Sequence, residues 1–127
     1  MENPYRVIAD KKKNRLYIDL YLNEEDQAQK IINDIWAKAK QLTVGWGCIV
    51  NYTKVNVQLT NYLLGIVEDV MSFLKPLGMG QLVRVLTEKQ SSLNDELKNR
   101  SMIIGRYEGI VARTIQDAEA ILDRIPD

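Results

Sequence analysis

The chain has 127 residues, which is enough for one domain with a single hydrophobic core. Its 17 basic and 17 acidic residues cancel, so no broad electrostatic attraction to nucleic acid or to an anionic membrane is expected. Histidine is absent and Cys48 is the only cysteine, which excludes an internal disulfide and every site built on imidazole, the commonest general base and metal ligand.

The first two predicted elements are strands that form a hairpin. Residues 5–9 are typical of a strand, residues 10–14 of a polar turn, and residues 16–22 alternate between apolar and polar side chains. This period of two predicts a strand with one buried face and one wetter face. Because the connection is short, the two strands are expected to be antiparallel.

The turn of this hairpin is basic and has aromatic neighbours. Lys11, Lys12 and Lys13 precede Arg15, and Tyr17 is expected to face outward beside them. Cations and aromatic rings on one sheet face can hold the phosphates and bases of a nucleic acid. The balanced net charge and the lack of a nucleic-acid motif favour another interpretation, a solvated turn that protects an exposed sheet edge.

A helix and a buried strand follow the hairpin. Asn23 is the predicted N-cap of the helix, and apolar residues then recur at helical spacing. The residues of this inner stripe are Ala28, Ile31, Ile32, Ile35, Trp36, Ala39 and Leu42. The apolar run 48–50 predicts a central strand. Cys48 starts that run and no histidine can activate it, so it is expected to be a small buried hydrophobe.

The rest of the chain alternates helix and strand. We predict a helix at 57–75 that Pro76 and Gly78 end, a strand at 82–86, a helix at 91–100, a strand at 107–112 and a last helix beginning at Thr114. Asp117, three residues after Thr114, completes an approximate capping box.

These elements predict one α/β domain that spans residues 1–127. Their order is β-β-α-β-α-β-α-β-α, with a mixed sheet of about five strands, an N-terminal antiparallel hairpin and four helices. The strands after the hairpin are joined through helices, so they are expected to be parallel, with right-handed crossovers.

Two glycine pairs have the composition of phosphate-binding loops but not their position. Gly45 and Gly47, like Gly78 and Gly80, follow a predicted helix and precede a predicted strand. A phosphate loop follows a strand and opens a helix, so both pairs are expected to be helix ends and turns. The carboxylates have no metal-site spacing either, so we expect no catalytic residue, metal or cofactor.

The predicted second helix is unusually apolar. Val57, Leu64 and Met71 form a row, spaced by seven residues, on the flank of its inner stripe. The apolar arc of about 220° is wider than the stripe of somewhat more than 100° that a surface helix usually has. Either this flank is buried between the sheet and neighbouring helices, or it is exposed and meets another protein or a second copy of the chain.

The sequence shows no candidate membrane anchor. Residues 1–4 lack the basic start and the apolar run of a signal peptide. The longest apolar stretch, 57–74, contains Glu68 and Asp69 and is a poor membrane span. We therefore expect a cytoplasmic protein without membrane insertion, and the single cysteine agrees with a reducing compartment.

In its element order and lengths, the chain resembles the STAS domain, named for sulfate transporters and anti-sigma factor antagonists. The most suggestive segments are Gln-Leu-Val-Arg-Val-Leu at 81–86 and the strand and capped helix at 107–125. The resemblance is to stand-alone bacterial versions. It implies a STAS-like fold and a non-catalytic regulatory or protein-interaction module of the anti-sigma factor antagonist type, whose partners dock near the start of the second helix.

The phosphorylation motif of that family is degenerate in this chain. The family carries an Asp-Ser-Ser/Thr-Gly-like stretch at the start of the second helix, where a partner kinase phosphorylates a serine or threonine. Setting Val55 against the family's usual valine places residues 59–62 over that motif, with Thr60 at the acceptor position. Leu59 then replaces the acid and Tyr62 replaces the glycine.

A small-ligand binder is the alternative. Open α/β sheets commonly hold ligands at the carboxyl ends of their parallel strands. A crevice there, beside the second helix, would be lined by Asn51, Tyr52 and Thr53. A small apolar molecule or a lipid is the ligand that this interpretation predicts.

Overall fold

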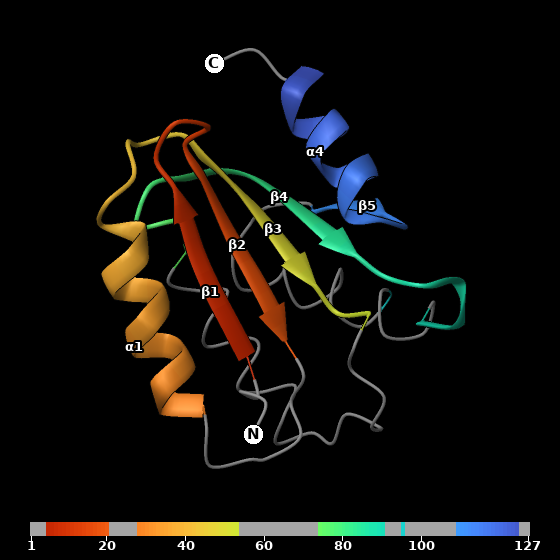
Figure 1. Cartoon of the computed structure of the whole chain (residues 1–127), viewed down its shortest axis with the longest axis horizontal. Helices are drawn as coiled ribbons and strands as arrows, with labels where there is room; N and C mark the ends of the chain where they lie inside the picture. Colours follow the sequence, from red (N-terminus) through yellow and green to blue (C-terminus); the bar gives the residue numbers. More distant parts are fainter. Residues whose placement is uncertain (1–4, 21–27, 54–73, 91–94, 96–108, 125–127) are drawn as a thin grey trace.

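The computed structural model describes residues 5–20, 28–53, 74–90, 95 and 109–124. These residues contain a five-stranded sheet (Figure 1). Its strands are β1 (Tyr5–Asp10), β2 (Arg15–Leu20), β3 (Trp46–Asn51), β4 (Met79–Val85) and β5 (Ile110–Ala112). The helical elements of the described part are α1 (Ala28–Ala39), the 3-10 turn η2 (Glu88–Gln90) and α4 (Ile115–Arg124).

The strands lie in the sheet in the same order as in the chain. β1 and β2 are antiparallel, whereas β2, β3, β4 and β5 are parallel to one another. In the turn of the hairpin the backbone N–H of Lys13 donates to Asp10 at 3.1 Å, and Asn14 takes a positive φ of 56°, which asparagine tolerates. The predicted hairpin and the predicted parallel strands are both confirmed.

The helices are confirmed in part. α1 and α4 correspond to the first and the last predicted helix. At α4 the predicted cap forms, because the backbone N–H of Asp117 donates to the Thr114 hydroxyl at 3.1 Å. The predicted helices at 57–75 and 91–100 lie almost wholly outside the described residues. The α/β class and the mixed sheet are therefore shown, and the count of four helices stays a prediction.

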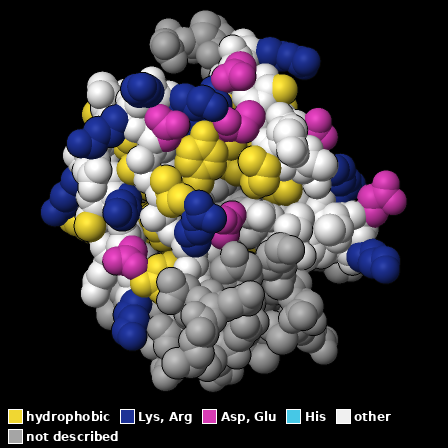
Figure 2. Space-filling model, in the orientation of Figure 1, with side chains coloured by type: hydrophobic (Ala, Val, Ile, Leu, Met, Phe, Trp, Pro, Cys, Tyr) yellow, Lys and Arg dark blue, Asp and Glu magenta, His cyan; other side chains and the backbone are white. Residues whose placement is uncertain are grey.

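One face of the sheet packs against α4. The α4-side cluster consists of Ile49, Val83, Val85, Ala112, Ala118 and Leu122. α4 contacts mainly β3, β4 and β5, so it covers one half of this face. Over the other half, Figure 2 shows apolar side chains with Lys, Arg, Asp and Glu side chains around them.

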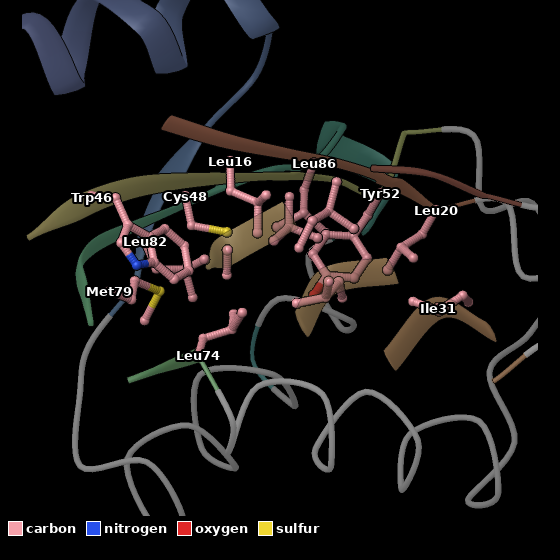
Figure 3. Packing of buried hydrophobic residues seen from close by; sticks show 14 residues of the cluster. Leu16, Leu20, Ile31, Trp46, Cys48, Tyr52, Leu74, Met79, Leu82 and Leu86 are labelled. Carbon is pink, nitrogen blue, oxygen red and sulfur yellow. The ribbon is translucent and has the colours of Figure 1, made fainter. Parts of the chain in front are cut away.

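The other face carries the larger part of the core. The α1-side cluster consists of Leu16, Ile18, Leu20, Ile31, Ile35, Ala39, Trp46, Cys48, Val50, Tyr52, Leu74, Met79, Leu82 and Leu86. Figure 3 shows these side chains extending from the strands toward one side, where Ile31 of α1 meets them. Leu74, near the end of the predicted second helix, is fully buried here.

The inner stripe predicted for α1 is wrong at one position. Ile31, Ile35 and Ala39 are buried as expected, but Trp36 is 39% exposed. At 100° per residue, Trp36 lies on the flank of the buried stripe. The Lys40 ammonium sits 5.0 Å from the centroid of its ring, so a cation covers part of the indole.

Glycines join β3 and β4 at their amino ends. Gly45 and Gly78 have positive φ angles of 95° and 110°, and the Gly45 N–H donates to the Gly78 carbonyl oxygen at 2.7 Å. Both are therefore turn residues, as predicted. Gly47 and Gly80 differ from the prediction because they belong to the strands β3 and β4. A Cβ atom at Gly80 would lie 2.7 Å from the Gly45 carbonyl oxygen.

This close approach makes Gly80 sensitive to the smallest substitution. We expect Gly80→Ala to lower the free energy of unfolding by about 1–3 kcal/mol, because the obstacle is backbone that cannot rotate away. Gly47→Ala is the matched control, since its Cβ would meet only the flexible end of the Leu122 side chain. Urea denaturation of the two variants checks the difference, and equal losses would contradict the interpretation.

Candidate functional site

The densest group of charged side chains in the described part lies between the hairpin and α4. We call Lys13, Arg15, Tyr17, Glu119 and Asp123 the Glu119 cluster. One Glu119 carboxylate oxygen accepts from Arg15 at 3.0 Å and from the Tyr17 hydroxyl at 2.6 Å, and the other accepts from Lys13 Nζ at 2.8 Å. A second nitrogen of the Arg15 guanidinium is paired with Asp123. The cluster therefore ties the beginning of the sheet to the last helix.

Helix geometry places both carboxylates over the same arginine. Glu119 and Asp123 are four residues apart, so they lie on one side of α4. Ala118 and Leu122, each one position earlier, are buried in the α4-side cluster and fix the rotation of the helix. Arg15 begins β2, which brings its side chain beneath that side of α4.

Arg15 corrects a prediction. The basic turn was expected to be solvated, and Lys11, Lys12 and Lys13 are exposed, but Arg15 is only 7% exposed. The side chains of α4 cover the face of β2 that carries Arg15 and Tyr17. This face is therefore less exposed to solvent than the alternation of apolar and polar residues predicted. A buried guanidinium is stable there because two carboxylates accept its hydrogen bonds.

The electrostatics of the cluster follow from these contacts. Burial alone would raise the pKa of Glu119, but hydrogen bonds from Lys13, Tyr17 and Arg15, with the charge of Arg15, outweigh it and lower that pKa. Burial, together with the hydrogen bond to Glu119, raises the pKa of Tyr17 to about 12. Both groups therefore keep one protonation state at neutral pH, which suits a structural clamp better than proton transfer.

The residues predicted to line a crevice do lie together at the carboxyl end of β3. The Asn51 side-chain oxygen accepts from the backbone N–H of Thr53 at 3.0 Å and from its hydroxyl at 2.7 Å. Tyr52 is fully buried in the α1-side cluster, and its carbonyl oxygen accepts from the Gln90 side chain at 2.9 Å. The polar groups of Asn51 and Thr53 are thus directed to one another.

Arg84 is a buried cation for which the sequence analysis proposed no role. It lies on β4 and is 1% exposed. A Cβ atom at position 109 would lie 2.5 Å from its guanidinium, so Gly109 leaves the space that the arginine occupies. The available sequence signal was a charge between Val83 and Val85, inside an otherwise apolar run. Such a residue is either exposed at a strand end or buried with specific surroundings.

Cys48 is a small buried hydrophobe, as predicted. It is fully buried, and burial raises its pKa far above the ordinary value. A thiol with a raised pKa supplies little of the thiolate that nucleophilic attack requires. Among the residues that the structure describes, no three acidic or cysteine side chains come close enough together to hold a metal ion.

The other predicted site residues lie outside the described part of the chain. They are the phosphorylation candidate Thr60 and the interface candidates Val57, Leu64 and Met71. Among the helices that are described, none is both long enough and apolar enough to cross a bilayer.

Comparison with known proteins does not assign a family. No protein-family model matches the chain, and no curated protein matches its sequence.

The contacts of the Glu119 cluster predict that the fold becomes less stable at acidic pH. The folded-state pKa of Glu119 is below its ordinary value of 4.5, so its contribution is complete above that pH and is lost as the pH falls through the lowered value. We expect Glu119→Gln to lower the free energy of unfolding by about 1–3 kcal/mol at neutral pH. The difference in this free energy between the variant and the wild type should narrow below pH 4.5. Glu88→Gln, on an exposed residue, is the control for urea denaturation across this pH range.

Two tyrosines predict a corresponding effect at alkaline pH. A hydrogen bond to Asp34 and burial raise the pKa of Tyr5 to about 12, as burial and Glu119 do for Tyr17. Because their pKa values are raised on folding, the two hydroxyls contribute fully to the stability of the fold below pH 10, and this contribution is lost as the pH approaches 12. We expect Tyr17→Phe to lower the free energy of unfolding by about 1 kcal/mol at neutral pH, and by progressively less between pH 10 and 12. Titration of tyrosinate absorbance checks the pKa, and ionisation of Tyr17 near 10 would contradict it.

Proposed function

We propose that the chain is a non-catalytic regulatory or protein-interaction module, similar to the anti-sigma factor antagonist type of STAS domain and acting in the bacterial cytoplasm. The observation that carries the proposal is the strand order. The resemblance to STAS domains rests on the order and lengths of the elements along the chain, and the described hairpin with its following parallel strands agrees with that order. The proposal extends that resemblance from the fold to the function.

The same strand order favours a binding module over a ligand-binding enzyme. In open α/β sheets, ligands bind where the strand order reverses and neighbouring crossovers leave on opposite faces. The five described strands contain no such reversal. The crossover helix α1 lies on one face, and α4, which follows the last of these strands, lies on the other.

The polar groups of the described part also favour a role without catalysis. In the Glu119 cluster each carboxylate oxygen of Glu119 already accepts from a cation or a hydroxyl. At the carboxyl end of β3, Asn51 bonds to Thr53. Groups that are committed to internal hydrogen bonds hold the fold together and leave little capacity to polarise a substrate.

In this proposal the second helix supplies the contact surface. The full burial of Leu74 agrees with an inner stripe that packs under the sheet, which leaves the row Val57, Leu64 and Met71 to one side of the helix. That row would meet the partner protein, and methionine suits an adaptable contact. Thr60, near the start of the same helix, remains the candidate for phosphorylation by a partner kinase.

The proposal is tested by capture of a partner from extracts of the natural host. We expect Leu64→Asp and Met71→Asp each to abolish capture, because a buried carboxylate without a partner is costly at an apolar interface. Lys12→Asp, on the exposed hairpin turn, is the control and should capture as the wild type does. Circular dichroism shows whether the variants are folded.

Folded Leu64→Asp and Met71→Asp variants that bind the same protein as the wild type would contradict the proposed surface. A wild-type chain that captures no partner at all would contradict the proposed function.

Binding of a small apolar molecule or a lipid is the second proposal, and it has less support. It requires Tyr52 to face an open crevice, whereas Tyr52 is fully buried in the α1-side cluster. A native mass spectrum of the protein from its host would favour this alternative if it showed a bound ligand.

A further inference from the structure

The hairpin carries a symmetrical charge pattern on the face that α4 leaves partly uncovered. On β1, Arg6, Ile8 and Asp10 share this face, because alternate residues of a strand point the same way. The register of the hairpin places them opposite three residues of β2, in the pairs Arg6–Asp19, Ile8–Tyr17 and Asp10–Arg15. Each charged pair brings together opposite charges, and the uncharged pair Ile8–Tyr17 lies between them.

β1 is an edge strand of the five-stranded sheet, with β2 as its neighbour. Ile8, at the middle of the strand, is 38% exposed, and Arg6 is exposed as well. α1 lies in the layer on the other face, where Ile31 and Ile35 join the α1-side cluster. An edge strand with an exposed apolar centre is a template for pairing with another strand.

We propose that a second copy of this chain pairs with β1 through an antiparallel β1–β1 contact, with the two-fold axis at Ile8. Antiparallel pairing about Ile8 sets Arg6 opposite the partner's Asp10, and Asp10 opposite the partner's Arg6. The two Ile8 side chains then meet at the axis. The two five-stranded sheets become one continuous sheet.

Charge complementarity selects this register over its neighbours. In the paired state one row across four strands reads Asp19, Arg6, the partner's Asp10 and the partner's Arg15, so positive and negative charges alternate. The central row contains Tyr17, Ile8 and their two copies, and none of these side chains is charged at neutral pH. A slip by two residues in either direction breaks both ion-paired rows, and a slip by one turns Ile8 away from its copy.

The lysines of the hairpin turn agree with this role. Lys11, Lys12 and Lys13 are exposed immediately beyond Asp10. Lysines at the end of an edge strand hinder pairing that would continue past it. They therefore limit the contact to the six residues of β1, which favours a closed dimer over an open aggregate.

The decisive experiment mixes two charge variants of the full chain. Arg6→Glu places two carboxylates opposite each other in its homodimer, and Asp10→Lys does the same with two cations. We expect each variant alone to dimerise at least about tenfold more weakly than the wild type in sedimentation equilibrium. Mixed together, they restore both ion pairs, and native mass spectrometry should show more heterodimer than random pairing gives.

The mixing result separates an interface from a local structural effect. Arg6 faces Asp19 and Asp10 accepts a hydrogen bond in the turn, so either substitution also weakens its own hairpin. Mixing two weakened hairpins cannot repair them, whereas it repairs the interface. Lys12→Glu is the matched charge reversal outside the paired strand, and it should leave the dissociation constant unchanged within about twofold.

A second measurement uses only the wild type. Hydrogen exchange of the β1 amides should slow as the protein concentration rises, because pairing covers the outer side of this edge strand of the described sheet. A monomer at every concentration, β1 amides that exchange at a constant rate, or variants that form no excess of heterodimer would overturn the inference.

This inference deepens the proposed interaction module, since it names a second copy as one partner, but it uses a different surface. Dimers that respond to Arg6 and Asp10, together with failed partner capture, would keep the inference and remove the proposed function. Partner capture that depends on Leu64 and Met71 in a monomeric chain would do the reverse.

Discussion

The burial of β3 on both faces is the constraint on which the rest of the structure depends. Cys48 and Val50 face the α1-side cluster and Ile49 faces the α4-side cluster, each with no more than 1% of its surface exposed. A strand without access to water must satisfy its backbone through its neighbours, which β2 and β4 do. Each face must also be covered, which requires helices on both sides.

Among the described residues of the sheet, the buried charged side chains are Arg15 and Arg84, and each has specific surroundings. Arg15 begins β2 and is matched by two carboxylates of α4, whereas Arg84 lies on β4 in space that Gly109 leaves open. Removing one partner from a buried ion pair is far more costly than losing an exposed pair. The ion pairs of Arg15 therefore make the position of α4 less tolerant of change than apolar contacts alone would. At the start of β5 the constraint is steric, because a side chain at position 109 would meet the Arg84 guanidinium.

Local patterns predicted most of the described fold, and long-range contacts account for what they missed. The period of two identified the hairpin, apolar runs identified β3 and β4, and the Thr114 cap identified α4. The burial of Arg15 depends on Glu119, which is 104 residues away, so no window of sequence around Arg15 contains its cause. Trp36 was assigned to the stripe by residue type, although its angular position places it on the flank.

The placement of strands in chain order has a consequence for the growing polypeptide at the ribosome. The hairpin leaves the tunnel before β3, β4 and β5, and each of these strands can dock on an edge that is already formed. α4, which follows β5 in the chain, supplies both carboxylates for the guanidinium at the start of β2. Until α4 emerges, the part of the nascent sheet that it covers stays exposed to water, so this face of the sheet closes only after α4 has left the tunnel.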